Sequence, residues 1–182
     1  MVSKENVLLE TFFNSQKHWH FEELRKFIKI GKPQLARWLK VFQKQGIIKR
    51  IKPQSKMPYY VANFSHPHYI NRKNLFAMQK MTESGLFDHL LSLQKTKVVI
   101  VFGSFSRADW HQDSDIDIFF YGNDTDFEQG KYELKLKRNI QLHTAKNTKD
   151  LQKIDKLLPY IIAGDFIKGS IEDLGVDIHA KA

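Results

Sequence analysis

Two aspartates, Asp115 and Asp117, stand at the start of an apolar run, and burying them uncompensated would cost several kcal/mol each. In a strand, residues two apart share a face, so these carboxylates point the same way and repel unless a cation lies between them. Carboxylate oxygens suit Mg²⁺, which keeps water ligands and bridges substrate phosphates. The spacing therefore predicts a divalent metal site, for Mg²⁺ or Mn²⁺, at Asp115 and Asp117.

A glycine-serine pair, Gly103-Ser104, ends the preceding apolar run at residues 97–102. Glycine lets a ligand approach the backbone, and a helix that begins at residues 104–109 would offer free N–H groups to phosphate. We expect Gly103, Ser104 and Arg107 to bind nucleotide.

A phosphate cradle beside a metal seat suits nucleotidyl transfer, in which one metal stabilises the leaving pyrophosphate. A second metal, about 3.5–4 Å away, lowers the pKa of the attacking hydroxyl. The competing interpretation is a plain β–turn–β unit with an acidic edge strand. Asp109 and Asp113 fit turn or cap positions better than ligand positions.

The stretch "VFGSFSRADWHQDSDIDIFF" resembles the DNA polymerase beta superfamily of nucleotidyltransferases, in which Gly-Ser is followed about ten residues later by Asp-apolar-Asp. The likeness covers residues 95–182 and is greatest to the minimal, antitoxin-like members. It implies metal-dependent transfer of an NMP from a nucleoside triphosphate to a protein or RNA hydroxyl. The alternative is a lapsed, nucleotidyltransferase-like transcriptional regulator that binds DNA and nucleotide or a partner without turnover.

The pattern departs from the family at a third carboxylate, which the resemblance places on a later strand. The matching strand is residues 140–145, and the acid position there is Gln141. Strand alternation puts His143 on the same face as Gln141, where it could bind a metal or take a proton. Asp177, near the end of the chain, is the other substitute that the sequence leaves open.

The first half of the chain is more basic than the second half. Residues 1–93 hold 16 Lys or Arg and 6 Asp or Glu, against 13 and 14 in the remainder. Apolar periodicity predicts helices over residues 6–13, 21–29 and 33–45, then a β hairpin over residues 46–64. A linker is expected at residues 65–73, followed by a helix over residues 75–93 that Gly85 interrupts.

This order of elements resembles a winged helix-turn-helix. The resemblance implies a recognition helix in the major groove and a wing that reaches phosphates. The alternative is a winged helix used only for protein contact. The residues expected to contact duplex DNA are Lys32, Gln34, Arg37, Lys40, Lys49, Arg50 and Lys52.

The predicted fold class is α+β: a winged helix-turn-helix at residues 1–66, a linker and connecting helix at 67–94, and a nucleotidyltransferase-type mixed sheet with helices at 95–182. The absence of cysteine excludes disulfides and thiolate zinc sites. No secretory signal or membrane span is evident. We expect a cytoplasmic protein without membrane contact, and a homodimer is left open.

Overall fold

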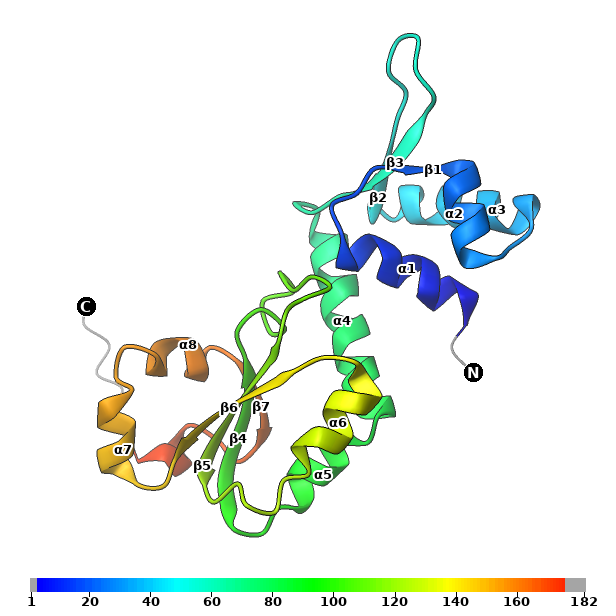
Figure 1. Ribbon diagram of the computed structural model, residues 1–182. Helices are drawn as coiled ribbons and strands as arrows, with labels where there is room; N and C mark the ends of the chain where they lie inside the picture. Colours follow the sequence, from blue (N-terminus) through cyan, green and yellow to red (C-terminus); the bar gives the residue numbers. More distant parts are fainter. Residues whose placement is uncertain (1–2, 176–182) are drawn as a thin grey trace. The chain divides into compact units, whose positions relative to one another are not determined.

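The computed structural model describes residues 3–175, and none of the helices in that range is long and apolar enough to cross a membrane. The chain divides into two compact units (Figure 1). The first comprises the residues up to 75 together with residues 110–112, and the second comprises residues 76–109 and those from 113 onward. The segment between Gly103 and Asp115 therefore gives three residues to the first unit.

The first unit is built from three helices and a three-stranded antiparallel sheet in the order β1-β3-β2. Apolar side chains from each helix form its core, among them Phe12, Leu24 and Leu39. The elements are α1 (Lys4–Asn14), β1 (Trp19–His20), α2 (Phe21–Ile28), α3 (Lys32–Lys44), β2 (Ile48–Ile51) and β3 (Tyr59–Ala62), and α4 (Pro67–Glu83) begins in this unit.

Local signals set the helix ends. Ser3 caps α1 by accepting a hydrogen bond from the Asn6 N–H, and Pro33 occupies the first turn of α3. After α3, Gly46 adopts a φ of +73°, and a side chain there would overlap the His66 ring. The three predicted helices and the β2–β3 hairpin are thus observed.

Two features of this unit differ from the sequence-based expectation. The segment expected to be a linker is helical, because α4 starts at Pro67, a residue suited to a first helical turn. The two-residue strand β1, which pairs with β3, was not predicted, since so short a strand has no periodicity of its own.

The second unit is a four-stranded mixed sheet in the order β6-β5-β4-β7. Strands β5 and β6 are parallel, while β4 is antiparallel to both of its neighbours. Gly85, with a φ of +78°, separates α4 from the next helix, as expected. The elements are α5 (Leu86–Ser92), β4 (Thr96–Phe102), β5 (Ile116–Gly122), α6 (Gln129–Leu136), β6 (Ile140–Ala145), α7 (Thr148–Lys153), α8 (Leu158–Ile162), β7 (Asp165–Lys168) and a 3₁₀ turn, η1 (Glu172–Leu174).

Helices cover both faces of this sheet, with α5 and α6 on one side and α7 and α8 on the other (Figure 1). On the α7–α8 side, Ile100 and Phe119 pack against Leu151 and Ile161. On the other side, the Phe120 ring lies 5.4 Å from that of Phe127. Both faces of β4 and β5 are therefore buried, which explains their continuous apolar runs.

The second unit differs from the sequence-based prediction at two places. Residues 103–108 form successive turns, so the helix expected directly after Gly103 is not observed. Strand β7, which lies between α8 and η1, was not predicted. Residues 165–168 form a strand because they pair with the free edge of β4, and so short a strand depends on its partner. Asp177 lies outside the described residues.

Candidate active site

The glycine and the second aspartate of the motif face each other across two strands. Phe102, at the end of β4, pairs with Asp117 of β5, so Gly103 follows directly beside that carboxylate. Gly103 has a φ of +74°, and a Cβ there would overlap Oδ2 of Asp117. Only glycine satisfies both the backbone conformation and the close approach.

Residues 103–109 coil tightly at the end of β4. The Gly103 carbonyl accepts hydrogen bonds from the Arg107 N–H at 3.3 Å and the Ser106 hydroxyl at 3.1 Å. The Asp109 N–H donates to the Ser104 carbonyl at 3.1 Å. Among the described residues, the N–H groups of Ser104 and Ser106 have no acceptor, so this loop offers donors for an anion.

Arg107 lies on the exposed side of the loop. Its Nε donates to Oδ2 of Asp109 at 3.1 Å, and both side chains are more than half exposed. The positive charge of Arg107 also acts on Asp117, whose ionised form it favours. Arg107 is thus close enough to influence the site while remaining accessible to a ligand.

The Asp117 carboxylate is half-buried. Burial raises its pKa, and the charge of Asp115 acts in the same direction, while His143 and Arg107 oppose the shift. His143 Nε2 lies 3.6 Å from Oδ1 of Asp117, beyond hydrogen-bond range. Burial therefore outweighs the favourable effect of His143 and Arg107 on the Asp117 carboxylate.

Gln141 lies at the position predicted for the missing acid. It pairs with Asp117 in the parallel β5–β6 register, and its side chain is exposed. His143, two residues on, follows on the same face and packs edge-on against Phe102, with ring centroids 5.1 Å apart. Within residues 3–175, no three His, Cys, Asp or Glu side chains are gathered as a ready-made metal cluster.

Arg138, which the sequence analysis did not single out, connects the two parts of the motif. Its Nη1 donates to the Ser114 carbonyl at 2.9 Å, and its guanidinium lies 5.1 Å from the centre of the Phe105 ring. It therefore holds the residue before Asp115 and the loop after Ser104 together. A lone arginine after a helix carries no sequence signal for such a role.

Asp165 was also missed, but the strand register separates it from the motif. It pairs with Val101 of β4, and the next residue of that strand, Phe102, pairs with Asp117. Successive residues of a strand face opposite sides, so Asp165 points away from the Asp117 face. Its Oδ2 is buried without a hydrogen-bond partner in residues 3–175, and burial raises its pKa.

The residues predicted to contact DNA lie in the first unit. On α3 the apolar face is buried, while Lys32, Arg37 and Lys40 are exposed. Gln34 is half-buried and accepts a hydrogen bond from Arg37 at 2.9 Å. The remaining predicted contacts, all exposed on or directly after β2, are Lys49, Arg50 and Lys52.

A loop with backbone N–H groups open to an anion at the end of β4, beside two carboxylates at the start of β5, is the arrangement that nucleotidyl transfer needs. Residues 84–178, just over half of the chain, match the family model of the nucleotidyltransferase domain, and the chain belongs to that family. The predicted resemblance is confirmed to this extent. Neither a curated protein nor a solved structure matches the chain.

Membership gives the reaction class in general terms: transfer of a nucleoside monophosphate from a nucleoside triphosphate. Nucleotidyltransferases of this family typically use divalent metals.

Proposed function

We propose that this protein is a metal-dependent nucleotidyltransferase that moves an NMP from an NTP onto a hydroxyl of a protein or an RNA. The observation that carries the proposal is the close approach of Gly103 to Asp117, which brings a phosphate-accepting loop and an acidic strand together. In the reaction, the hydroxyl oxygen bonds to the α-phosphorus, the bond to pyrophosphate breaks and the hydroxyl proton leaves to solvent.

The side chains present fit a divalent cation. Asp117 is a half-buried carboxylate whose pKa is raised by burial, and Asp115 lies two residues before it, with Ile116 buried between them. Asp115 and Asp117 would hold Mg²⁺ or Mn²⁺, and the ion would neutralise charge on the triphosphate and the leaving pyrophosphate.

The backbone and Arg107 supply the other half of the site. The N–H groups of Ser104 and Ser106 would hold phosphate oxygens, and Gly103 lets the triphosphate lie close to the chain. Arg107, exposed at the loop, would add a mobile positive charge. Arg138 keeps this loop in register with Asp115 through Phe105 and Ser114.

One observation favours a second candidate, a nucleotide-binding regulator without turnover. Gln141 stands next to Asp117, where a third carboxylate is expected, and a neutral amide is a weak ligand for a hard cation. In that case the metal that contacts the triphosphate, held by Asp115 and Asp117, would still bind. Nucleotide binding would persist while transfer is slow or absent.

We further propose that the first unit is a winged helix-turn-helix that binds duplex DNA. The order of α2, α3 and the β2–β3 hairpin supports the assignment, with α3 as recognition helix and residues 52–58 as the wing. The exposed cations of α3 and β2 would contact the DNA phosphates through electrostatic attraction.

The metal site is tested by thermal unfolding with Mg²⁺ and a nucleoside triphosphate. A ligand at a hundred times its Kd adds about 2.7 kcal/mol to the free energy of unfolding. Asp115→Asn combined with Asp117→Asn should lose this gain. The charge-matched control, Asp126→Asn with Asp155→Asn, removes two exposed acids of the same unit and should keep it. A full ligand-induced gain in the first variant would contradict the proposed site.

A further inference from the structure

The first inference concerns the polar atom nearest to the Asp117 carboxylate. His143 Nε2 is buried and has no hydrogen-bond partner among the described residues. A buried ring nitrogen is normally satisfied, so its isolation calls for a ligand. The nearest acceptor, Oδ1 of Asp117, lies 3.6 Å away, and each side chain is only 23% exposed.

This separation is too long for a hydrogen bond but suits two atoms that share a cation. Nitrogen and oxygen ligands lie about 2.0–2.2 Å from such ions, so they stand about 2.8–3.1 Å apart around an octahedral ion and about 3.3–3.6 Å apart at a tetrahedral angle. The separation of His143 from Asp117 is at the wide end of this range, so a shift of about half an ångström would suit an octahedral ion. The ring is held by its edge-on contact with Phe102, and it lies on the same face of β6 as Gln141.

We propose that His143 is a metal ligand that acts in place of the acid missing at Gln141. This rests on the proposed metal site at Asp115 and Asp117. Asp117 and His143 form a pair rather than a closed cluster, so the remaining ligands would be Asp115, water and oxygens of the triphosphate. A nitrogen ligand favours transition-metal ions over Mg²⁺, so the site would discriminate between them.

The experiment uses the full chain with Mn²⁺ alone, followed by electron paramagnetic resonance. Wild type should bind one Mn²⁺ ion and show a hyperfine coupling from a directly bound nitrogen. His143→Gln should lose the coupling and bind Mn²⁺ about tenfold more weakly, with a smaller loss for Mg²⁺. His143→Asp should keep the affinity without the nitrogen coupling, which a merely structural role would not produce. His18→Gln, at an exposed histidine of the first unit, is the control.

The outcomes separate the two proposals. Mn²⁺ that binds through Asp115 and Asp117 without a nitrogen coupling, and with equal affinity in His143→Gln, overturns the role of His143 and leaves the metal site standing. Mn²⁺ binding that survives Asp115→Asn with Asp117→Asn contradicts the metal site itself.

A second inference rests on a hollow at the opposite end of the sheet. Its volume is about 330 Å³, within the range of small-molecule sites. Asp117 is near the start of β5 and Gly122 ends it, so about 3.3 Å per residue places the hollow some 17 Å from the candidate active site. Its lining residues are Lys95, Lys97, Tyr121, Gly122, Asn123 and Lys146.

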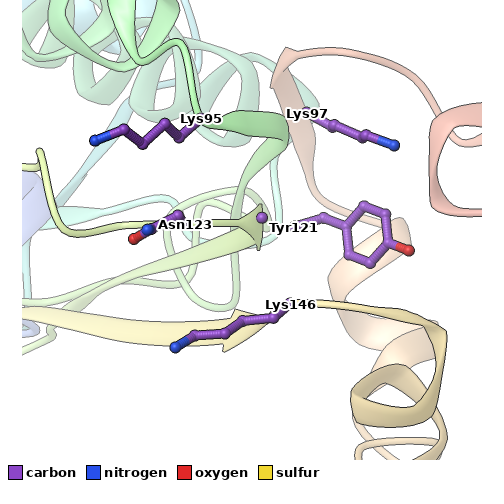
Figure 2. A pocket seen from close by; sticks show the side chains of 6 residues that line it. Lys95, Lys97, Tyr121, Asn123 and Lys146 are labelled. Carbon is purple, nitrogen blue, oxygen red and sulfur yellow. The ribbon is translucent and has the colours of Figure 1, made fainter.

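The hollow is positively charged. Figure 2 shows Lys95, Asn123 and Lys146 extending to one side of the strand ends, with Lys97 and Tyr121 on the other. Lys95 pairs with an exposed Asp126 at 3.2 Å. Among residues 3–175, the ammonium groups of Lys97 and Lys146 form no ion pair.

Neighbouring groups leave this charge in place. Asp124, which follows the hollow, accepts a hydrogen bond from the Thr144 hydroxyl at 2.7 Å. Asp150 pairs with Lys153 at 2.8 Å and also accepts from the Lys146 backbone N–H. Lys95 and Lys146, on one side of the strand ends, thus face Asp126 and Asp150, and Asp150 already pairs with Lys153. With Lys97 on the other side, positive charge exceeds negative charge around the hollow, so an anion is the ligand that it favours.

We infer that this hollow binds a phosphate-bearing ligand. The phosphate could belong to a free nucleotide or to single-stranded RNA, and both present the same chemistry to the lysines. The site is independent of the metal, so it is tested in EDTA.

The test measures binding of a labelled mononucleotide and of a labelled RNA decamer to the full chain. The triple variant is Lys95→Gln, Lys97→Gln and Lys146→Gln. Its charge-matched control is Lys149→Gln, Lys153→Gln and Lys156→Gln, at exposed lysines of the segment that follows β6.

For RNA, the triple variant should bind about tenfold more weakly than the control. The slope of log K against log salt should fall by about 2, since each single-strand contact contributes about 0.7. A loss confined to the nucleotide identifies a free nucleotide as the source, and a loss confined to RNA identifies the strand. Equal binding by the triple variant and the control, for both probes, overturns the inference.

Discussion

Gly103 and Asp117 touch across the β4–β5 pair: a Cβ on Gly103 would overlap the carboxylate oxygen and lie 3.1 Å from Asp117 Cγ. This contact links the loop that would hold phosphate to the strand that would hold metal. A change at either residue therefore affects both halves of the candidate site.

Gly103→Ala should lower the free energy of unfolding by about 1–3 kcal/mol, because alanine is strained at a φ of +74°. It should also displace Asp117 and abolish the stabilisation by Mg²⁺ and nucleoside triphosphate. The measurement is urea unfolding with and without the ligands. Gly130→Ala is the matched control, since a side chain at this helical glycine meets nothing within 4 Å, and it should be neutral or stabilising by up to about 1 kcal/mol.

Gln141→Asp should raise the rate of NMP transfer, or create it, because a carboxylate beside Asp117 adds a hard anionic ligand. We expect a gain of about tenfold or more in kcat, equal to roughly 1.4 kcal/mol, with little change in KM. Transfer of labelled nucleotide to protein and RNA from a cell extract measures it. Gln152→Asp, at an exposed residue of α7, should have no effect. Brisk wild-type transfer that Gln141→Asp impairs would show that Gln141 does not occupy a vacated ligand position.

Asp165→Asn should raise the free energy of unfolding at pH 7. Burial raises the pKa of Asp165 above its ordinary value of 3.8, so the folded chain binds more protons than the unfolded chain between those two values. Stability of the wild type falls as pH rises through this window and stays lower above it.

The gain in Asp165→Asn should therefore shrink as pH falls toward 4 and vanish below it. We expect less than about 1 kcal/mol, because part of this carboxyl remains in contact with water. Urea unfolding from pH 3 to pH 7 measures it, with the exposed Asp126→Asn as control. A variant less stable than wild type at pH 7 would mean that the Asp165 carboxylate has a favourable partner.

Arg37→Ala with Lys40→Ala should weaken binding to duplex DNA without unfolding the first unit, because both side chains are exposed on α3. The slope of log K against log salt should fall by about 2, at about 0.9 for each lost phosphate contact. Fluorescence anisotropy with a labelled duplex measures both. The control, Lys149→Ala with Lys153→Ala, removes the same charge from α7. If wild type does not bind duplex even at low salt, the assignment of α3 is wrong.

Much of this protein could be read from its sequence, because the strongest signals are local. Periodicity and the residues at helix ends gave α1, α2 and α3, and the β2–β3 hairpin followed from two β-rich runs. The spacing of Gly103, Asp115 and Asp117 predicted the nucleotidyltransferase class, and the family match bears that out. The family resemblance implied Gln141 as the position of the third acid, and the β5–β6 register places it opposite Asp117.

What depends on pairing partners needed the tertiary structure. Strand β7 forms because β4 has a free edge, and it is too short to show a periodicity in the sequence. The 3.6 Å separation of His143 from Asp117, and the tie that Arg138 makes between Ser114 and Phe105, join residues 24 to 33 positions apart in the chain. The sequence states which residue types are present, and their spacing predicts which face of a strand they share. Only the packed sheet brings distant side chains to a particular distance.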